Sequence, residues 1–256
     1  MARYKVILAY DGSGFFGSQT QAKPRTVQGE FERALRKIGW NGRSVVMAGR
    51  TDTGVHATGQ VAAFDLDWTH PPEKLFKALD TNLPPDLAVQ SLTPAPADFH
   101  PRFDATSRQY RYRLFCDPIR DPLREKFLWR VFPPVDGDAL IRNAGIFCGT
   151  HDFAAFGSPT TPAPRGTTIR TVTKAEWKRM PDGEWQFEVR ADAFLYRMAR
   201  RLVFVQVSLA QGKVPLERVL TALERQESLP AGLAPAHGLT LVEVTYGSHE
   251  KIMKTE

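Results

Sequence analysis

The loop Gly49-Arg50-Thr51-Asp52-Thr53-Gly54-Val55-His56 holds the residue types best able to do chemistry in this chain. It places one carboxylate, that of Asp52, between Arg50 and His56, among small residues that would let a ligand approach closely. The plainer interpretation is a turn, because aspartate bonds its own backbone and glycine accepts a positive φ. Asp52 is therefore a candidate catalytic residue, with Arg50 and His56 as candidate substrate-binding residues beside it.

Two familiar motifs in the first sixty residues are set aside. Asp52-Thr53-Gly54 matches the aspartic-protease signature, but such an enzyme needs two aspartates that share a proton, and the chain has no second Asp-Thr-Gly. The stretch 12–17 fits GxGxxG after a strand, which is the pattern of a dinucleotide-binding turn. That turn requires a helix to open at Gly17, and Pro24 prevents a helix from running through the following residues.

A second candidate residue, Arg200, lies in a segment with helical spacing. The pattern predicts a largely buried helix over 194–211, with a broad apolar face and further apolar residues on the side that carries Arg200. A buried guanidinium needs a carboxylate, because an unpaired buried charge costs several kcal/mol, roughly. A structural ion pair would satisfy this need. Asp52 is the candidate partner, although no spacing in the sequence fixes that contact.

The strand-like segment 107–113 places Tyr110 and Tyr112 on one face, and Arg111 and Arg113 on the other. Tyrosines on one strand face are usually part of a core. Interleaved arginines also suit a platform on which unpaired bases stack. The six histidines show no metal-ligand spacing, so we predict no metal.

Composition favours a nucleic-acid partner. Hydrophobic residues make up 42% and charged residues 24% of 256 residues, which is typical of a globular protein. The net charge of +6 favours an acidic partner. Cys116 and Cys148 are too few for a disulfide framework. No apolar run approaches the roughly 20 residues of a membrane span, and the first residues lack the apolar core of a signal peptide. We therefore expect a cytoplasmic protein without a membrane association.

The order of predicted elements is β-α-β-β-α-β, and it occurs twice, so we predict an α+β fold of two tandem split-βαβ (ferredoxin-like) units. Antiparallel or mixed sheets of the two units would join around a central basic cleft. We predict units at 1–104 and 105–246 and a polar tail at 247–256. The expected strands are 3–10, 44–48, 58–67, 87–92, 107–116, 168–179, 184–192 and 241–246, and the expected helices are 27–38, 72–79, 138–147, 194–211 and 216–225.

Taken together, these residues resemble the family of tRNA pseudouridine synthase A. The resemblance covers nearly the whole chain in order, and GRTDTGVHA is its most specific motif. It rests on the segments AYDGSGFFGSQTQ (9–21), TVQGEFERAL (26–35), AGRTDTGVHATGQVAAF (48–64), LPPDLAV (83–89), FHPRFDATSRQYRYRL (99–114), FCGTHDFAAF (147–156), FLYRMARRLV (194–203) and AHGLTLVEVTY (236–246).

The resemblance implies a cofactor-free isomerisation of uridines 38, 39 and 40 in the tRNA anticodon stem-loop, performed by a homodimer with the pseudouridine synthase fold. By position, Asp52 matches the family's catalytic aspartate, Arg50 the arginine beside it, Tyr110 the tyrosine that contacts the target base, and Arg200 the arginine that pairs with the aspartate. A competing hypothesis is an RNA-binding module or tRNA chaperone of the same fold that has lost the chemistry.

The chain departs from the family's pattern at three places. Ser18 stands where an aromatic residue usually follows the glycine, the family's glycine near Phe204 is missing, and Pro101 replaces a small residue. None of these positions is one of the three predicted catalytic residues. Ser18 could alter a stacking contact at the rim of the cleft.

Overall fold

The computed structural model describes residues 1–159, 167–225 and 227–247. Its strands form one continuous sheet. The path through the sheet is β4-β1-β3-β10-β5-β9-β8-β7, while β2 pairs with β3 and β6 with β5. The strands are β1 (Ala2–Tyr10), β2 (Val46–Met47), β3 (His56–Leu66), β4 (Leu87–Ala95), β5 (Ala105–Cys116), β6 (Trp129–Val131), β7 (Gly149–Asp152), β8 (Ile169–Arg179), β9 (Trp185–Ala191) and β10 (Leu239–Tyr246). The helices are α1 (Val27–Lys37), α2 (Pro72–Asn82), α3 (Gly137–Ala144), α4 (Met198–Ala210) and α5 (Leu216–Arg225).

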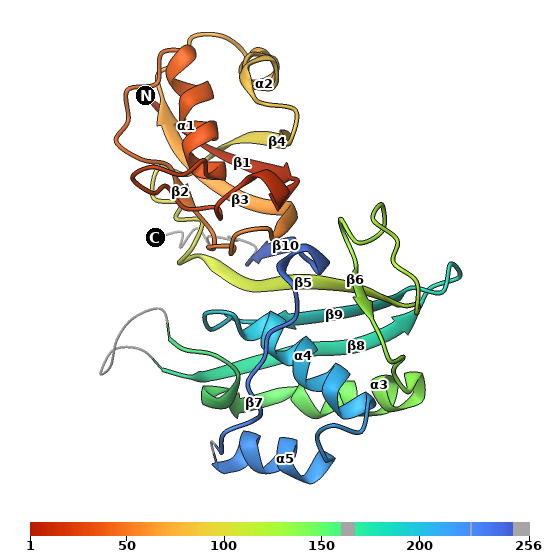
Figure 1. The fold of residues 1–256 in the computed structure, drawn as a ribbon. Helices are drawn as coiled ribbons and strands as arrows, with labels where there is room; N and C mark the ends of the chain where they lie inside the picture. Colours follow the sequence, from red (N-terminus) through yellow and green to blue (C-terminus); the bar gives the residue numbers. More distant parts are fainter. Residues whose placement is uncertain (160–166, 226, 248–256) are drawn as a thin grey trace, which may run out of the picture.

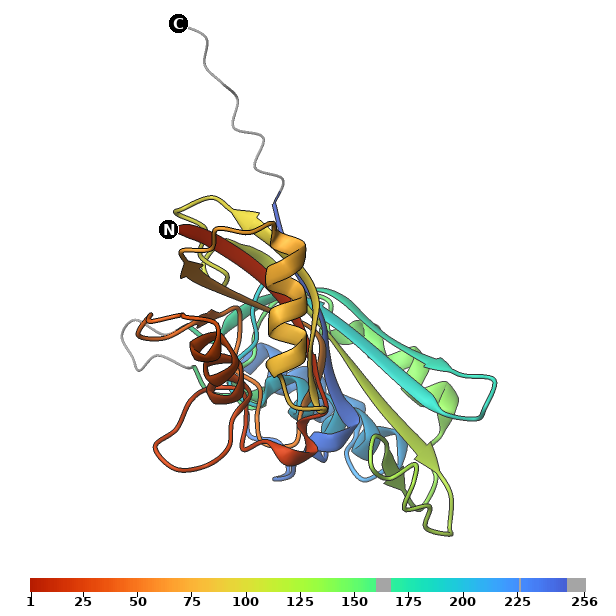
Figure 2. The ribbon, with the colours of Figure 1, turned by 90° about the horizontal axis from the view of Figure 1, so that it is seen from above.

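The first β-α-β-β-α-β unit has the strand neighbours of a split-βαβ fold. Strand β1 lies between β4 and β3, and both pairings are antiparallel. Thr26 caps α1 as its residue type predicts, since its side chain accepts a hydrogen bond from the Gly29 amide at 3.2 Å. The apolar face of α1 reaches the sheet, where the ring of Phe31 meets Phe64 edge-on at 5.8 Å. Seen from above, α2 lies in front of the strands of this unit (Figure 2).

The second unit repeats this arrangement, with β5 between β10 and β9, and β8 beyond β9. In Figure 1, helix α4 lies in front of β8 and β9 with α3 beside it, and α5 lies below β7. The fold class expected from the sequence is confirmed. The sequence missed the short strands β6 and β7. It also placed the start of the long helix four residues too early, since α4 begins at Met198 and not at Phe194.

The early start was wrong because residues before Met198 form other contacts. The Tyr196 amide donates to the Ser158 carbonyl at 2.9 Å, which makes an isolated bridge between two extended segments. Arg197 follows with a φ of 64°, in the left-handed region that an α-helix cannot use. The chain therefore turns sharply before it enters α4.

The two units are joined at β3 and β10. These strands pair in parallel, with Thr240 opposite His56 and Leu241 opposite Ala57. The backbones come so close beyond this pairing that a Cβ atom at Gly59 would lie 2.2 Å from the Val242 carbonyl oxygen. The last strand of the second unit thus borders the strand that follows the Asp52 loop. The division at residues 104 and 105 stays a prediction.

Residues 248–256, which make up most of the predicted polar tail 247–256, lie outside the described part of the chain. No helix within the described ranges is both long and apolar enough to cross a membrane.

We expect Gly59→Ala to destabilise the protein by about 1–3 kcal/mol, because the added methyl group would push β3 away from β10. Urea denaturation followed by circular dichroism would measure this change. Gly145→Ala is the matched control, since Gly145 has a helical φ of −67° and a Cβ there would meet nothing within 4 Å. Equal stabilities of the two variants would show that the junction tolerates a side chain.

Candidate active site

The Asp52 loop connects β2 to β3 and forms the turn that its residue types indicate. The Val55 amide donates to the Asp52 carbonyl at 3.1 Å, and Gly54 has a φ of 79°, which favours glycine. The preceding residue is also fixed, because the Thr51 hydroxyl lies 2.9 Å from the Tyr10 hydroxyl. The backbone on both sides of Asp52 is therefore held in place.

Arg200 reaches this loop from the first turns of α4. Its Nη1 donates to Oδ2 of Asp52 at 2.8 Å, and the two side chains are 14% and 23% exposed. The Nε of Arg200 donates to the Ala234 carbonyl at 2.8 Å, which fixes the direction of the guanidinium. The structure thus brings together two predicted residues that are 148 positions apart in the chain.

Tyr110 lies on β5 and is almost completely buried. Its ring meets Phe194 edge-on, with 4.9 Å between the ring centres. Burial raises the pKa of Tyr110 well above its usual value, and the nearby Tyr10 and Asp52 contribute in the same direction. The phenol is therefore protonated at neutral pH.

A cavity of about 970 Å³ lies between the two units and contains Asp52, Tyr110 and Arg200 in its lining. Among the described residues of this lining, Asp52 is the only acidic one. The lining also holds six arginines, namely Arg50, Arg102, Arg108, Arg170, Arg197 and Arg200. The cavity is thus a basic cleft, as expected, and it holds one carboxylate among its described lining residues.

Several lining residues were not singled out from the sequence. Phe16 and Phe103 are exposed aromatic residues of the cleft, and Tyr196 is 48% exposed although the sequence placed it on a buried helix. The guanidinium of Arg197 lies over the Tyr196 ring at 4.7 Å from its centre. An exposed aromatic ring beside a cation can stack on a base. For Phe16, the sequence signal was the glycine-rich segment 12–17, which is typical of a loop.

Arg108 is another missed residue, and it has a different environment. Its guanidinium donates to four backbone carbonyls, those of Ala48, Arg102, Ala105 and Asp192, at 2.6–3.4 Å. Burial lowers the pKa of Arg108. Because these carbonyls come from both units, Arg108 holds the wall of the cleft together beside Tyr110.

His56 does not line this cleft, which argues against its expected role as a substrate-binding residue beside Asp52. His56 is the first residue of β3, and its side chain lies against the start of the loop that follows β1. There, its Nδ1 accepts a hydrogen bond from the Gly12 amide at 3.0 Å and lies 3.3 Å from Oδ1 of Asp11. Burial lowers the pKa of His56, so the neutral ring acts as an acceptor. The described residues hold no group of three His, Cys, Asp or Glu side chains that could bind a metal.

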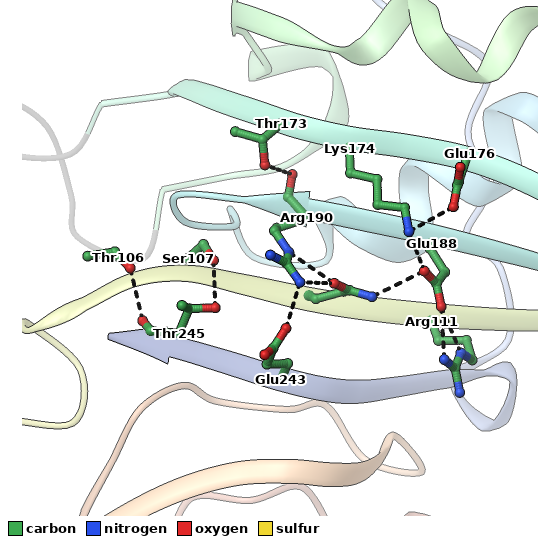
Figure 3. A network of polar contacts seen from close by, with 11 residues as sticks. Thr106, Ser107, Arg111, Thr173, Lys174, Glu176, Glu188, Arg190, Glu243 and Thr245 are labelled. Atoms are coloured by element: carbon green, nitrogen blue, oxygen red, sulfur yellow. Dashed lines mark hydrogen bonds and ion pairs between the residues drawn. The ribbon is translucent and has the colours of Figure 1, made fainter. Parts of the chain in front are cut away.

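Arg111 and Arg113 point to the opposite face of β5 from Tyr110. Arg111 pairs with Glu188 at 2.8 Å, and Arg113 pairs with Glu184 at 2.7 Å. Figure 3 shows Arg111 within a network of polar side chains on this face, where Glu188 also binds Lys174. These arginines neutralise carboxylates of the sheet. Neither arginine lines the cleft that contains Tyr110.

A family model described as tRNA pseudouridine synthase matches residues 6–104 and 144–247, which is more than half of the chain. The chain belongs to the tRNA pseudouridine synthase family. Members of this family are isomerases, and the pseudouridine synthase fold agrees with the arrangement of the two units. Asp52 and Arg200 lie within the two matched segments, and Tyr110 lies between them.

Relatives in this tRNA pseudouridine synthase family are similar along almost their whole length. A tRNA pseudouridine synthase A of Limosilactobacillus fermentum is 39% identical over 255 residues, with 97% of each chain covered. One from Chloroflexus aurantiacus is 40% identical over 253 residues, covering 96% of this chain and 89% of the relative. One from Shouchella clausii is 39% identical over 249 residues, covering 96% of this chain and 94% of the relative.

The corrected surroundings of His56 give a prediction for Asp11. Burial alone would raise the pKa of Asp11, but hydrogen bonds from Ser13 and Lys126 lower it to about 2. Below the ordinary carboxyl pKa, Asp11 becomes protonated in the unfolded chain but stays ionised in the folded protein until the pH nears 2. The stabilisation from the ionised carboxylate is therefore complete above the ordinary carboxyl pKa and is lost as the pH falls toward 2.

We therefore expect Asp11→Asn to lower the free energy of unfolding at pH 7 by about 1 kcal/mol, after allowance for solvent screening. The difference from wild type should shrink between about pH 5 and pH 2. Urea denaturation at a series of pH values would measure it, with the exposed Asp80→Asn as the control. A difference that is independent of pH would contradict the assignment.

Proposed function

We propose that this chain isomerises uridine to pseudouridine at positions 38, 39 and 40 of the tRNA anticodon stem-loop, with Asp52 as its catalytic carboxylate. The observation that carries this proposal is that the basic cleft holds one carboxylate among its described lining residues, bound by Arg200 at 2.8 Å. An RNA backbone would meet the arginines of the lining, and Asp52 is the acidic group there that could react with a nucleotide. The names of the relatives support tRNA as the substrate.

The reaction must break the C1′–N1 bond of uridine and form a C1′–C5 bond. Arg200 binds Oδ2 of Asp52, and no donor from the described residues binds Oδ1. The guanidinium opposes the carboxylate's charge and sets its direction, which leaves Oδ1 available to the nucleotide. This oxygen could attack the sugar or the pyrimidine ring, or stabilise a cationic sugar. The detached uracil must stay in the cleft while it turns.

Tyr110 contributes a ring and a protonated hydroxyl. Tyr110 could help to remove the C5 proton if its own proton is shared with Asp52 or water, while N1 of the detached uracil gains a proton. The edge-on contact with Phe194 keeps the phenol ring in place beside the cleft. Tyr110 is therefore proposed to pack against the uracil and to hold it during its rotation.

A stacked anticodon arm hides the reacting atoms, so the target uridine must leave the stack at a cost of a few kcal/mol, roughly. Arg50 is exposed in the lining, where it can fill the vacated position or bind the adjacent phosphate. The exposed ring of Phe103 can stack on a neighbouring base. The proposal includes a homodimer acting in the cytoplasm without a cofactor, as the family resemblance implies.

We expect Asp52→Asn to abolish pseudouridine formation, with a loss of at least about 1,000-fold, because the amide cannot replace the carboxylate in the reaction. The protein would be incubated with unmodified tRNA, and pseudouridine would be mapped as carbodiimide-dependent stops of reverse transcription. Asp80→Asn, an exposed aspartate on α2, is the matched control.

Wild-type protein that gives stops at positions 38–40 supports the proposal. Wild-type protein that binds tRNA but gives no new stops would instead identify an RNA-binding module or tRNA chaperone. Full activity of Asp52→Asn would remove Asp52 from the mechanism.

We expect Arg200→Ala to reduce turnover about 100-fold or more while tRNA affinity changes less than about fivefold, because it leaves a largely buried carboxylate without its partner. Single-turnover rates and filter-binding affinities would separate the two effects. Arg102→Ala is the comparison, since this exposed arginine of the cleft has no carboxylate partner among the described residues and should affect affinity more than turnover. Equal losses of rate and affinity in Arg200→Ala would contradict its role.

A further inference from the structure

Ser18 forms a reciprocal pair of hydrogen bonds with the residue that precedes Asp52. Thr51 donates its amide to Oγ of Ser18 at 2.8 Å, and the Ser18 amide donates to the Thr51 carbonyl at 3.1 Å. Ser18 is only 1% exposed and Thr51 is 7% exposed. We propose that Ser18 is a positioning residue, whose hydroxyl fixes the backbone of the Asp52 loop for catalysis. This inference rests on the proposed role of Asp52.

Ser18 is itself fixed to α1. Its carbonyl accepts the Gln28 amide at 2.9 Å, and the Gly17 carbonyl accepts the Val27 amide at 3.3 Å. These donors belong to the first turn of α1, whose amides have no partner within the helix. The helix end, Ser18 and Thr51 therefore form a continuous hydrogen-bonded support for the residue beside Asp52.

Gly17, the residue before Ser18, also lies close to the backbone of Thr51. Gly17 has a φ of 88°, and a Cβ atom there would lie 3.0 Å from the Thr51 carbonyl oxygen. A larger residue at position 17 would thus press on the backbone that Ser18 holds. The close approach at Gly17 allows the short side chain of Ser18 to reach the Thr51 amide.

Thr51 has a partner for each of its polar groups. Besides the two bonds to Ser18, its hydroxyl lies 2.9 Å from the hydroxyl of Tyr10 on β1. The Asp52 carboxylate is held at its other end by Arg200. Ser18 therefore fixes the backbone next to Asp52, and Arg200 fixes the carboxylate of Asp52. A displacement of about 1 Å at a reacting group can reduce a rate about 100-fold.

In this proposal Ser18 does not bind the tRNA itself. The Ser18 hydroxyl accepts a hydrogen bond from a backbone amide, and Ser18 is buried although it belongs to the lining of the cleft. Its loss should therefore slow the isomerisation without weakening tRNA binding.

The test measures the single-turnover rate, the tRNA affinity and the melting temperature of Ser18→Ala. We expect the rate to fall about tenfold, equivalent to about 1.4 kcal/mol in activation free energy, because the buried Thr51 amide loses its acceptor. The affinity should stay within about twofold. Ser208→Ala is the matched control, since Ser208 is a buried serine on α4 outside the cleft lining. Its rate should equal that of wild type.

Ser18→Thr, which keeps the hydroxyl, should retain most of the rate even if Ser18→Ala folds poorly. An unchanged rate in Ser18→Ala, an equal loss of rate and affinity, or a rate in Ser18→Thr as low as that in Ser18→Ala would each overturn the proposal. Asp52→Asn is measured in parallel. If it is as active as wild type, the proposed function fails; if it is inactive while Ser18→Ala is fully active, only the role of Ser18 fails.

Discussion

The ion pair between Asp52 and Arg200 is the contact on which the cleft depends. Asp52 belongs to the first unit and Arg200 to the second, so the pair forms only when both units are in place. A carboxylate that is three-quarters buried among arginines needs a fixed opposite charge, and a guanidinium at the start of a helix needs a carboxylate. The same contact satisfies both needs, and it uses only one of the two carboxylate oxygens of a residue that lines the cleft.

The continuous sheet supplies the rigidity that this pair requires. Strand β10 runs between β5, which carries Tyr110, and β3, which follows the Asp52 loop directly. The segment just before β10 accepts the Arg200 side chain through the Ala234 carbonyl. One short region of chain thereby sets the relative positions of all three proposed catalytic residues. The close approach of β10 at Gly59 leaves little freedom for the units to separate.

Much of the fold could be predicted because local patterns determined it. The alternation in β1, the Thr26 cap and the apolar face of α1 all agree with the final structure. The pairing of Asp52 with Arg200 was expected from the cost of burying a charge, but only the tertiary structure fixes the partner. Tyr196 was misplaced because helical spacing cannot reveal a bridge to Ser158 or a left-handed residue at position 197.

His56 and Arg111 show why neighbours in sequence need not share a site. His56 follows Asp52 by four residues, but the turn at Gly54 and the start of β3 direct its ring to Asp11 instead. Arg111 is adjacent to Tyr110, but successive residues of a strand point to opposite faces, and Glu188 binds it there. Arg108 shares the face of Tyr110, and backbone carbonyls bind it in place of a carboxylate. Among the described lining residues, Asp52 is thus the one negative charge, which concentrates the proposed reactivity at a single side chain and leaves RNA binding to the arginines of the cleft.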